Sequence, residues 1–307
     1  LPISIIVGDV NGLKLTNDVF GHAAGDELLK KVAEIFKKVC RADDIITREG
    51  GDEFIVLLTN TKAIEAEKII ARIKNEFSKE QMLTLKGSIS MGSDTKTSVE
   101  QDITSIIEAA EDKMYMEKTI NRKRVYSNQI RTIMKTLYSR NPREKKHSQN
   151  VSELCGKIGR AMDLSDEEIK RLEDAGFYHD IGKIALDENK INNHTNLTEQ
   201  EKKEIKQHSV VGYRILNLFD ETLNLAESVL AHHERWDGSG YPKGLKGKEI
   251  PKLARIIAVA ESYDSMTNEM NNSIISREEA LERIKSRAGI KFDPKVVDIF
   301  LNLMMEN

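Results

Sequence analysis

The stretch HHERWDGSGYP at residues 232–242 decides most about this chain of 307 residues, together with HDIGKI at residues 179–184. Both stretches concentrate a scarce residue type, because the chain contains seven histidines. Five of them combine with two aspartates into a candidate ligand set without a thiolate: His147, His179, Asp180, His208, His232, His233 and Asp264. Such nitrogen and oxygen ligands suit manganese, iron or zinc bound for chemistry. The alternative, polar groups scattered on helix surfaces, explains any single histidine better than all five.

The composition, with 39% hydrophobic and 32% charged residues, predicts a helix-rich globular protein of one large or two ordinary domains. A net charge of −3 provides no basic field, so we expect no nucleic-acid partner. Cys40 and Cys155 lie in helical apolar patterns, and we interpret them as buried thiols of a reducing, cytoplasmic compartment. No apolar run reaches membrane-spanning length. Because the chain begins at Leu1 without a methionine, we expect a fragment whose upstream part can hold a sensor or a membrane anchor.

The N-terminal half has the pattern of alternating strands and helices. The apolar run ISIIVGD at residues 3–9 is typical of a buried strand. Further along, the sequence predicts a helix at 25–40, a hairpin with a Gly-Gly turn at 45–58, a helix at 62–77, a strand at 84–92 and a helix at 101–117. This β-α-β-β-α-β order is that of the ferredoxin-like or polymerase-palm arrangement.

The C-terminal half is predicted to be all helical. Residues 126–140 form a connecting helix that ends at Asn141-Pro142. Three later helix starts have the capping-box pattern, at Ser165/Glu168, Thr198/Glu201 and Ser276/Glu279. The fold class is therefore α+β, with a ferredoxin-like domain followed by a helical domain.

The HD pair is suited to a centre with two ions. Neighbouring residues on one helix point in different directions, so Asp180 can bridge two ions while His179 serves one. Lys183 lies one turn beyond His179, where it can neutralise a phosphate, although a solvated lysine is the alternative. Gly240, Tyr241 and Pro242 predict a tight ligand-facing loop, for which a plain interhelical turn is the alternative.

Residues 135–307 resemble an HD-GYP domain, the phosphodiesterase branch of the HD superfamily that acts on cyclic di-GMP. The resemblance is carried by HSQNV, HDIGKI, HSVVGYRIL, HHERWDGSGYPKGL, AESYDSMT and FDPKVV. It implies hydrolysis to pGpG and GMP at two transition metals, iron or manganese ahead of zinc. It places the metal ligands on His147, His179, Asp180, His208, His232, His233 and Asp264, the catalytic lysine at Lys183 and substrate contacts in Gly240–Pro242.

Two positions depart from that family pattern. Some members have a metal-binding glutamate four residues before the first histidine, where this chain has Arg143. Glu144 follows it and points in a different direction around the helix, so we expect two ions and no third. The basic and aromatic stretch that usually follows the YDxMT motif is replaced by residues 269–273, which puts affinity or substrate choice in question.

Acidic residues of the N-terminal half are expected to meet at the hairpin. Asp9 ends the first strand and Asp52-Glu53 follow the Gly-Gly turn, so their carboxylates can gather magnesium across adjacent strands. A polar hairpin tip is the alternative. The glycine-containing segment 20–26 precedes a helix and can accept phosphate at its amino end.

Residues 1–127 resemble a GGDEF diguanylate cyclase domain through DVNGLKLTNDVFGHAAGDELL, REGGDEF and EKTINRKRV. The resemblance implies magnesium with GTP, a catalytic Glu53, and metal contacts from Asp9, Glu53, the Val10 carbonyl and the neighbouring Asp52. It places guanine recognition on Asn17 and Asp26, triphosphate contacts on Lys118 and Arg122, and a product-inhibition site on Arg41 and Asp44. A surface salt bridge is the alternative for the last pair. Because cyclases act as two facing domains, we expect a homodimer.

These resemblances predict a cyclic di-GMP turnover protein with a GGDEF domain at 1–127, a connecting helix at 128–140 and an HD-GYP domain at 141–307. The second domain degrades cyclic di-GMP, and the first makes it from GTP or binds GTP to regulate its neighbour. Two alternatives remain open: a receptor that binds nucleotides without turning them over, and a hydrolase of cyclic GMP-AMP.

Overall fold

The computed structural model describes residues 1–79, 81–82, 85–86, 88–187, 197–268 and 274–305, and of residues 81–82, 85–86 and 122–128 the backbone only. The chain forms two compact units, Leu1–Ile133 and Met134–Asn307. The first contains a sheet with helices and the second is helical, so the α+β prediction is confirmed.

The N-terminal unit is built on a four-stranded antiparallel sheet with the order β2-β3-β1-β6. The central strand β1 (Ile3–Asn11) pairs with β3 (Glu53–Thr59) and with β6 (Ser88–Lys96), and β2 (Ile45–Gly50) pairs with β3 on the other side. The seven residues of β1 from Ser4 to Val10 are buried, because helices cover both faces of the sheet.

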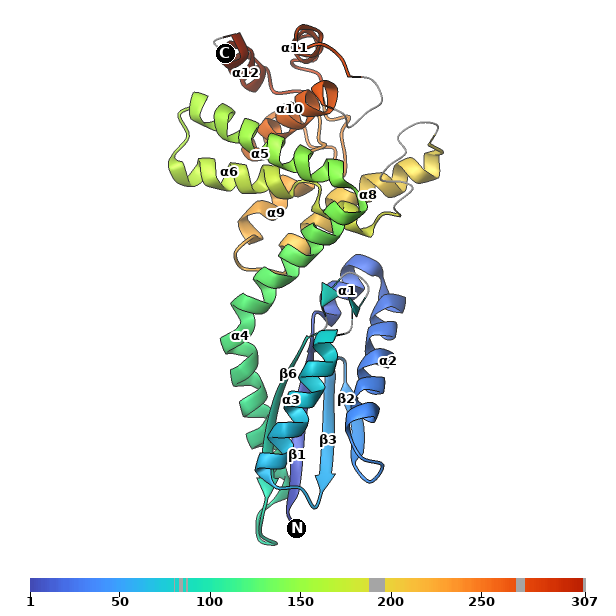
Figure 1. Ribbon diagram of the computed structural model, residues 1–307. Helices are drawn as coiled ribbons and strands as arrows, with labels where there is room; N and C mark the ends of the chain where they lie inside the picture. The colour runs from blue at the N-terminus through green and yellow to red at the C-terminus, as the bar shows by residue number, and fades with distance from the viewer. Residues whose placement is uncertain (80, 83–84, 87, 188–196, 269–273, 306–307) are drawn as a thin grey trace. The chain divides into compact units, whose positions relative to one another are not determined.

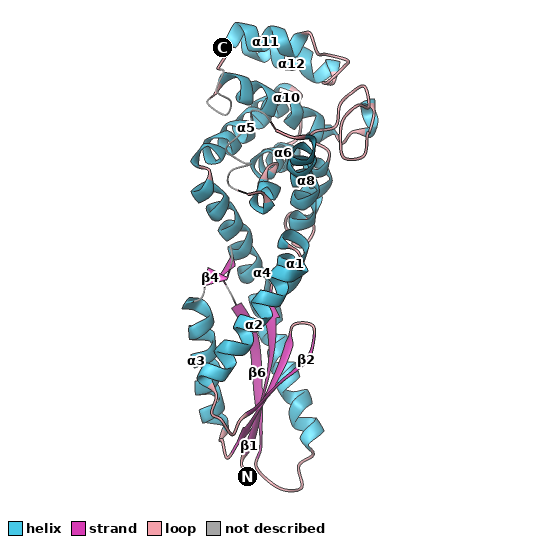
Figure 2. Ribbon diagram, turned by 90° about the vertical axis from the view of Figure 1, so that its right-hand side faces the viewer, coloured by secondary structure: helices cyan, strands magenta, loops and turns pink. Residues whose placement is uncertain are grey.

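Two helices cover one face of this sheet, α2 (His22–Val39) and α3 (Ala63–Lys79) (Figure 1). On that face Phe36 of α2 stacks on Phe54 of β3, with ring centroids 5.3 Å apart. The opposite face packs against α4 (Ile103–Arg140), where Ile5 and Val7 meet Ile106 and Ala110. Figure 2 shows the strands and helices in a second view.

The observed elements differ from the predicted ones in three places. A short helix, α1 (Leu13–Phe20), was not predicted; it begins after Gly12, whose φ of 87° turns the chain sharply out of β1. The strand predicted at 84–92 is instead β6, preceded by a hairpin of β4 (Gln81–Met82) and β5 (Leu85–Lys86), because β1 pairs with residues 88 to 96. The helices predicted at 101–117 and 126–140 are one helix, α4, since no glycine or proline interrupts it.

The C-terminal unit consists of helices, as predicted. Its elements are α5 (Pro142–Ala161), α6 (Asp166–Tyr178), η1 (Ile181–Ala185), α8 (Glu199–Leu216), α9 (Leu223–Leu230), η2 (Gly247–Glu249), α10 (Lys252–Thr267), α11 (Arg277–Lys285) and α12 (Pro294–Met305). None of the helices in the described parts of the chain is long and apolar enough to cross a membrane.

Side-chain caps define where several of these helices begin. The capping boxes predicted at Ser165 and Thr198 are both formed, with reciprocal bonds to the glutamate three residues later. At α11 only half of the predicted box forms: Ser276 accepts from the Glu279 N–H, while the Glu279 carboxylate accepts from Arg283 at 2.7 Å. The i,i+4 partner on the same helix competes for that carboxylate.

Candidate metal centre and nucleotide site

The histidines of the predicted centre come from different elements of the helical unit. His147 lies on α5, His179 directly follows α6, His208 lies on α8, and the pair His232-His233 follows α9. The first four are at most 2% exposed. Buried imidazoles that converge from facing helices are the usual construction of a metal centre in a helical domain.

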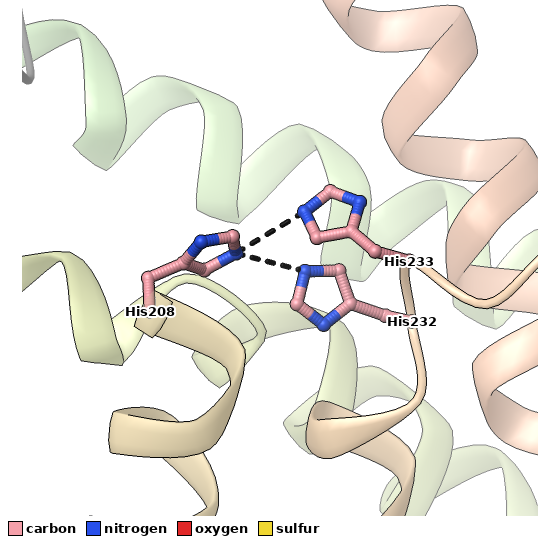
Figure 3. Close-up of side chains that lie close together, drawn as sticks. All are labelled: His208, His232 and His233. Carbon is pink, nitrogen blue, oxygen red and sulfur yellow. Dashed lines mark hydrogen bonds between the residues drawn. The ribbon is translucent and has the colours of Figure 1, made fainter. Parts of the chain in front are cut away.

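Among the described residues, two groups of side chains each offer ligand atoms that lie within 4.8 Å of one another. The first is His147, His179 and Asp180, and the second is His208, His232 and His233. In Figure 3, the Nε2 atom of His208 points toward the rings of both His232 and His233.

Asp180 lies between the two groups and faces each with a different oxygen. Its Oδ2 atom is 3.0 Å from Nε2 of His179 and 3.8 Å from Nε2 of His147. Its Oδ1 atom is 3.3 Å from Nε2 of His208. One carboxylate is thereby shared by both groups, which is the arrangement that a bridging ligand requires.

Backbone carbonyls hold three of the imidazoles from behind. The Nδ1 atoms of His179, His208 and His232 lie against the carbonyls of Gly176, Ile205 and Val229, in each case three residues earlier. A carbonyl accepts only from a protonated nitrogen, so Nδ1 donates, and in the neutral imidazole Nε2 keeps the lone pair that faces the centre. In their neutral form these three histidines have the tautomer that a metal needs.

Burial keeps most of this cluster uncharged. Desolvation lowers the pKa of His208, and it lowers those of His232 and His233 well below the usual value, helped by mutual repulsion. His179 differs, because the adjacent Asp180 carboxylate outweighs desolvation and raises its pKa to about 9. Burial opposes ionisation of Asp180, but His179 and Lys183 hold its pKa well below the usual value. The neutral histidines and the ionised aspartate are the protonation states that bind cations.

The donor set fits a metal by a second criterion, the polar atoms left without a hydrogen bond. Among the described residues, buried atoms of this kind include Nε2 of His179 and Oδ1 of Asp180, both members of the first ligand group. Buried polar atoms are normally paired, and two such atoms in one ligand group require an explanation. Coordination of cations supplies it.

Lys183 is held beside the centre by two carboxylates. Its Nζ atom donates to Oε1 of Glu144 at 2.7 Å and lies 2.8 Å from Oδ2 of Asp180. These charges raise the pKa of Lys183 despite burial, so the ammonium persists. The alternative of a solvated lysine does not describe this side chain, which is 14% exposed. Gly182 allows the placement, because a Cβ there would lie 1.9 Å from the carbonyl oxygen of His208.

The structure corrects the expectation for Arg143 and Glu144. Arg143 is exposed, whereas Glu144 is fully buried and points at Lys183. The separation of three residues between Glu144 and His147 keeps both on one face of α5, as i,i+3 spacing does. Sequence reasoning placed Glu144 away from the centre because it used the spacing of four residues only.

Glu261 was missed by the sequence reasoning, and Asp264 has an unexpected neighbour. Oε2 of Glu261 lies 3.8 Å from Nδ1 of His233. Asp264 belongs to neither ligand group; its Oδ2 atom lies 2.6 Å from Nδ1 of His147, the nitrogen remote from Asp180. Both acids lie on α10, one turn apart, and this i,i+3 relation was the available signal.

The loop of residues 238–242 packs against the histidines. The Tyr241 ring is tilted against His233, with centroids 4.9 Å apart, and Lys206 lies 5.2 Å from the Tyr241 centroid. Gly240 is required, since a Cβ would lie 2.5 Å from Cα of Glu234. The buried Glu234 accepts backbone N–H bonds from residues 243, 244 and 245 and so fixes the chain directly after Pro242. No pattern in the sequence predicted this role of Glu234.

The acidic groups of the N-terminal unit meet as predicted. Asp9 and Glu53 are direct partners in the β1–β3 register, and the Val10 N–H donates to the Asp52 carbonyl at 3.0 Å. Asp9 is buried and its Oδ2 accepts from Lys118 at 2.6 Å, while its Oδ1 has no hydrogen bond among the described residues. Burial raises the pKa of Asp9 against the opposing effect of Lys118. A cation would satisfy the remaining oxygen, which fits a magnesium ligand.

The other residues predicted to contact nucleotide lie on α1, α2 and α4. Asn17 of α1 contacts the start of α2 so closely that a Cβ on Gly25 would lie 1.9 Å from its Oδ1, and the neighbouring Asp26 is exposed. Arg122 lies in α4, but its side chain is outside the described residues.

Arg41 and Asp44 form a turn in place of a salt bridge. The Asp44 carboxylate accepts from the backbone N–H of Arg41 at 2.7 Å. The Arg41 side chain is exposed and makes no ion pair with Asp44 in the described structure, so the salt-bridge alternative is not observed. The segment 269–273, where the sequence departs from the HD-GYP pattern, lies outside the described residues.

Each half of the chain matches the model of a known protein family. Residues 131–296 match a family model described as HD domain, and residues 1–124 match that of the diguanylate cyclase GGDEF domain.

Curated relatives cover part of the chain. A cyclic di-GMP phosphodiesterase of Thermotoga maritima is 40% identical over 164 residues, which are 52% of this chain and 45% of that protein. The cyclic di-GMP phosphodiesterase response regulator RpfG of Xanthomonas campestris is 35% identical over 156 residues, 50% of this chain and 41% of that protein. The 3'3'-cGAMP-specific phosphodiesterase 2 of Vibrio cholerae is 32% identical over 158 residues, 50% of this chain and 30% of that protein. The matched segments thus span less than half of each relative.

Proposed function

The chain belongs to the HD domain family, and on that premise we propose that its C-terminal unit is a metal-dependent phosphodiesterase of cyclic dinucleotides. The substrate is cyclic di-GMP, and the products are pGpG and, after a second cleavage, GMP. We place this domain at residues 141–307, joined by residues 128–140 to a GGDEF domain at 1–127. Relatives named as cyclic di-GMP phosphodiesterases support this assignment.

The position of Asp180 carries the proposal. One oxygen faces His147 and His179, and the other faces His208. A carboxylate with one oxygen toward each ligand group is what a dinuclear centre needs, and no structural role accounts for an orphaned Oδ1 at such a buried position.

The ligands divide into two groups around that bridge. His147 and His179 would hold one ion, and His208, His232 and His233 the other, with Asp180 shared. Glu261 lies 3.8 Å from Nδ1 of His233, the nitrogen that does not face His208, and would orient that imidazole. Asp264 is better placed to orient His147 through Nδ1, a common role of a carboxylate behind a histidine ligand. When bound, such ions polarise the phosphate and lower the pKa of water. We propose iron or manganese ahead of zinc, as the HD-GYP resemblance implies; histidine and carboxylate ligands suit all three metals.

Hydrolysis adds one water across a P–O3′ bond, so phosphorus gains a hydroxyl oxygen and the leaving 3′ oxygen gains a proton. Lys183 keeps its proton and lies 2.8 Å from Asp180, where its charge would stabilise the developing negative charge on phosphate oxygens. Tyr241, packed on His233, would line the side of the substrate.

The N-terminal unit is proposed to bind GTP with magnesium and to make cyclic di-GMP from it, or to regulate its neighbour. Asp9, Glu53 and the Val10 carbonyl would hold the ion, with Asp52 beside them. Asn17 and Asp26 would recognise guanine, and Lys118 and Arg122 the triphosphate. Arg41 and Asp44 would bind the product. Synthesis needs two such units, each with one GTP, so we propose a homodimer.

One experiment tests both activities. Purified protein is incubated separately with cyclic di-GMP plus manganese and with GTP plus magnesium, and the nucleotides are separated by chromatography. Formation of pGpG or GMP from cyclic di-GMP is expected; an intact dinucleotide at full manganese occupancy contradicts the phosphodiesterase. Asp180→Ala, which is expected to lack hydrolysis, is the negative control.

Two other functions give different results in the same assay. A hydrolase of cyclic GMP-AMP, suggested by the Vibrio cholerae relative named as specific for 3'3'-cGAMP, would cleave that substrate faster than cyclic di-GMP. A nucleotide receptor would bind both dinucleotides and cleave neither; the complete ligand groups argue against it.

A further inference from the structure

A pocket of about 280 Å³ lies in the C-terminal unit next to the histidine centre. It is lined by residues of α10, of α11 and of the segment before α12: Glu261, Ser262, Ser265, Met266, Arg283, Arg287, Lys291 and Phe292. Three of these side chains are cationic and one is anionic. The proposed hydrolytic step does not use the cations.

Two of the three cations, Arg287 and Lys291, make no ion pair with a carboxylate among the described residues. Arg283 is paired with Glu279 at 2.7 Å. The Arg287 guanidinium has no hydrogen-bond or ion-pair partner within the described ranges. Lys291 donates to Oγ of Ser262 at 2.8 Å. Burial lowers the pKa of Lys291; Glu261 opposes this shift, and Arg287 adds to it. Two neighbouring positive charges with spare donors favour an anion.

The backbone fixes this pair relative to the metal centre. The Trp236 N–H donates to the Lys291 carbonyl at 3.1 Å, and the Asp237 N–H donates to the Ile290 carbonyl at 2.9 Å. The segment that carries Lys291 is thus joined to the loop that follows His232-His233. Glu261, which forms one wall of the pocket, lies 3.8 Å from His233. The pocket and the second histidine group are therefore direct neighbours.

We propose that Arg287 and Lys291 bind the second, non-scissile phosphate of the cyclic dinucleotide. This inference rests on the proposed function. A cyclic dinucleotide carries two phosphodiester groups, each with one negative charge, and only one is cleaved at a time. The guanidinium supplies a planar pair of donors and the ammonium a point charge. Ser262 accepts from Lys291, so its own hydroxyl proton is available to the phosphate.

The test compares two substrates that differ in this second phosphate. Cyclic di-GMP has it, whereas bis(p-nitrophenyl) phosphate is a diester with a single phosphate. Arg287→Ala and Lys291→Met should each raise KM for cyclic di-GMP tenfold or more and leave cleavage of bis(p-nitrophenyl) phosphate within twofold. Arg287→Lys, which keeps the charge, should recover part of the loss. Lys285→Ala removes an exposed charge from α11 outside the pocket and should change neither substrate.

The outcomes separate this inference from the proposed function. An unchanged KM in both variants overturns the inference, while wild-type cleavage of cyclic di-GMP still supports the function. An equal loss on both substrates also overturns it, because the residues would then support the metal centre or the fold. If the wild type cleaves only bis(p-nitrophenyl) phosphate, the cyclic dinucleotide substrate is wrong and the inference falls with it.

Discussion

Oδ2 of Asp264 lies 2.6 Å from Nδ1 of His147, on the ring edge opposite the nitrogen that approaches Asp180. Oδ1 of the same carboxylate accepts from the amides of Asn150, at 2.8 Å, and Asn268, at 2.6 Å. Both oxygens of Asp264 are therefore engaged by other side chains. We propose that Asp264 acts on the centre through the orientation and basicity of His147.

Replacing Asp264 with asparagine should weaken metal binding without abolishing it. Loss of a carboxylate behind a histidine ligand typically lowers metal affinity about 10- to 100-fold. Titration with manganese, followed by calorimetry, measures the change, and the exposed Asp298→Asn on α12 is the control. Complete loss of one ion in Asp264→Asn would instead identify Asp264 as a ligand.

Asp180→Ala should abolish hydrolysis of cyclic di-GMP, because both ligand groups lose their shared carboxylate. We expect turnover to fall by at least about a thousandfold, in line with the loss of an electrostatic group at the reaction centre. A thermal melt of the same variant should remain cooperative. Turnover equal to that of the wild type would refute the bridging role.

Elemental analysis of anaerobically purified protein should give close to two transition metals per chain. Oε1 of Glu144 accepts from Lys183 at 2.7 Å, so only Oε2 is left for a third ion. One oxygen does not hold an ion by itself, and we therefore expect Glu144→Gln to leave the count at two. A reproducible third ion in the wild type that disappears in Glu144→Gln would show that this carboxylate is a ligand.

Acid should destabilise the metal-free protein. The folded-state pKa values of His208, His232 and His233 lie below the ordinary 6.5, so below that pH the unfolded chain binds more protons than the folded one. Stability is then lost as pH falls. His179 acts in the opposite sense: its pKa of about 9 stabilises the fold below 6.5, an effect lost as pH rises through 9.

Thermal melts in EDTA between pH 5 and 8 measure this balance. Because the pKa is lowered in three of these histidines and raised in one, we expect the Tm at pH 5 to be several degrees below that at pH 8. Substituting the exposed His22 with glutamine should not alter the slope. A Tm that stays constant over this range would contradict the charge assignment.

GTP should bind the N-terminal unit in the presence of magnesium, and Asp9→Asn should weaken that binding about tenfold or more. The Asp9 carboxylate is the buried acid at the end of β1, and its free oxygen is the candidate contact. Calorimetry measures both proteins, with the exposed Asp43→Asn as the control. Absence of binding to the wild type at millimolar GTP would mean that the site is not formed.

The sequence predicted the residues of the centre that lie in short, recognisable motifs. The five histidines were predicted because histidine is scarce and grouped in this chain, and Asp180 was predicted because it directly follows His179. The pairing of Asp9 with Glu53 followed from the strand and hairpin pattern.

Glu144 and Glu261 could not be identified in the same way. Acidic residues are common in this chain, with 50 aspartates and glutamates, so one more carboxylate on a helix carries little information. Their roles depend on which helix face turns inward, and tertiary packing decides that. The helix boundary predicted near residue 125 failed for a related reason: local pattern did not show that α4 continues.

The carbonyls that hold His179, His208 and His232 belong to the main chain of Gly176, Ile205 and Val229. A main-chain acceptor is present whatever side chain a position carries. Mutational drift at position 205 can therefore exchange one helix-forming residue for another without turning the imidazole of His208. Position 176 is the exception, since a Cβ there would approach Sγ of Cys155 to 3.1 Å. Related chains should accordingly vary freely at the first site and keep a small residue at the second.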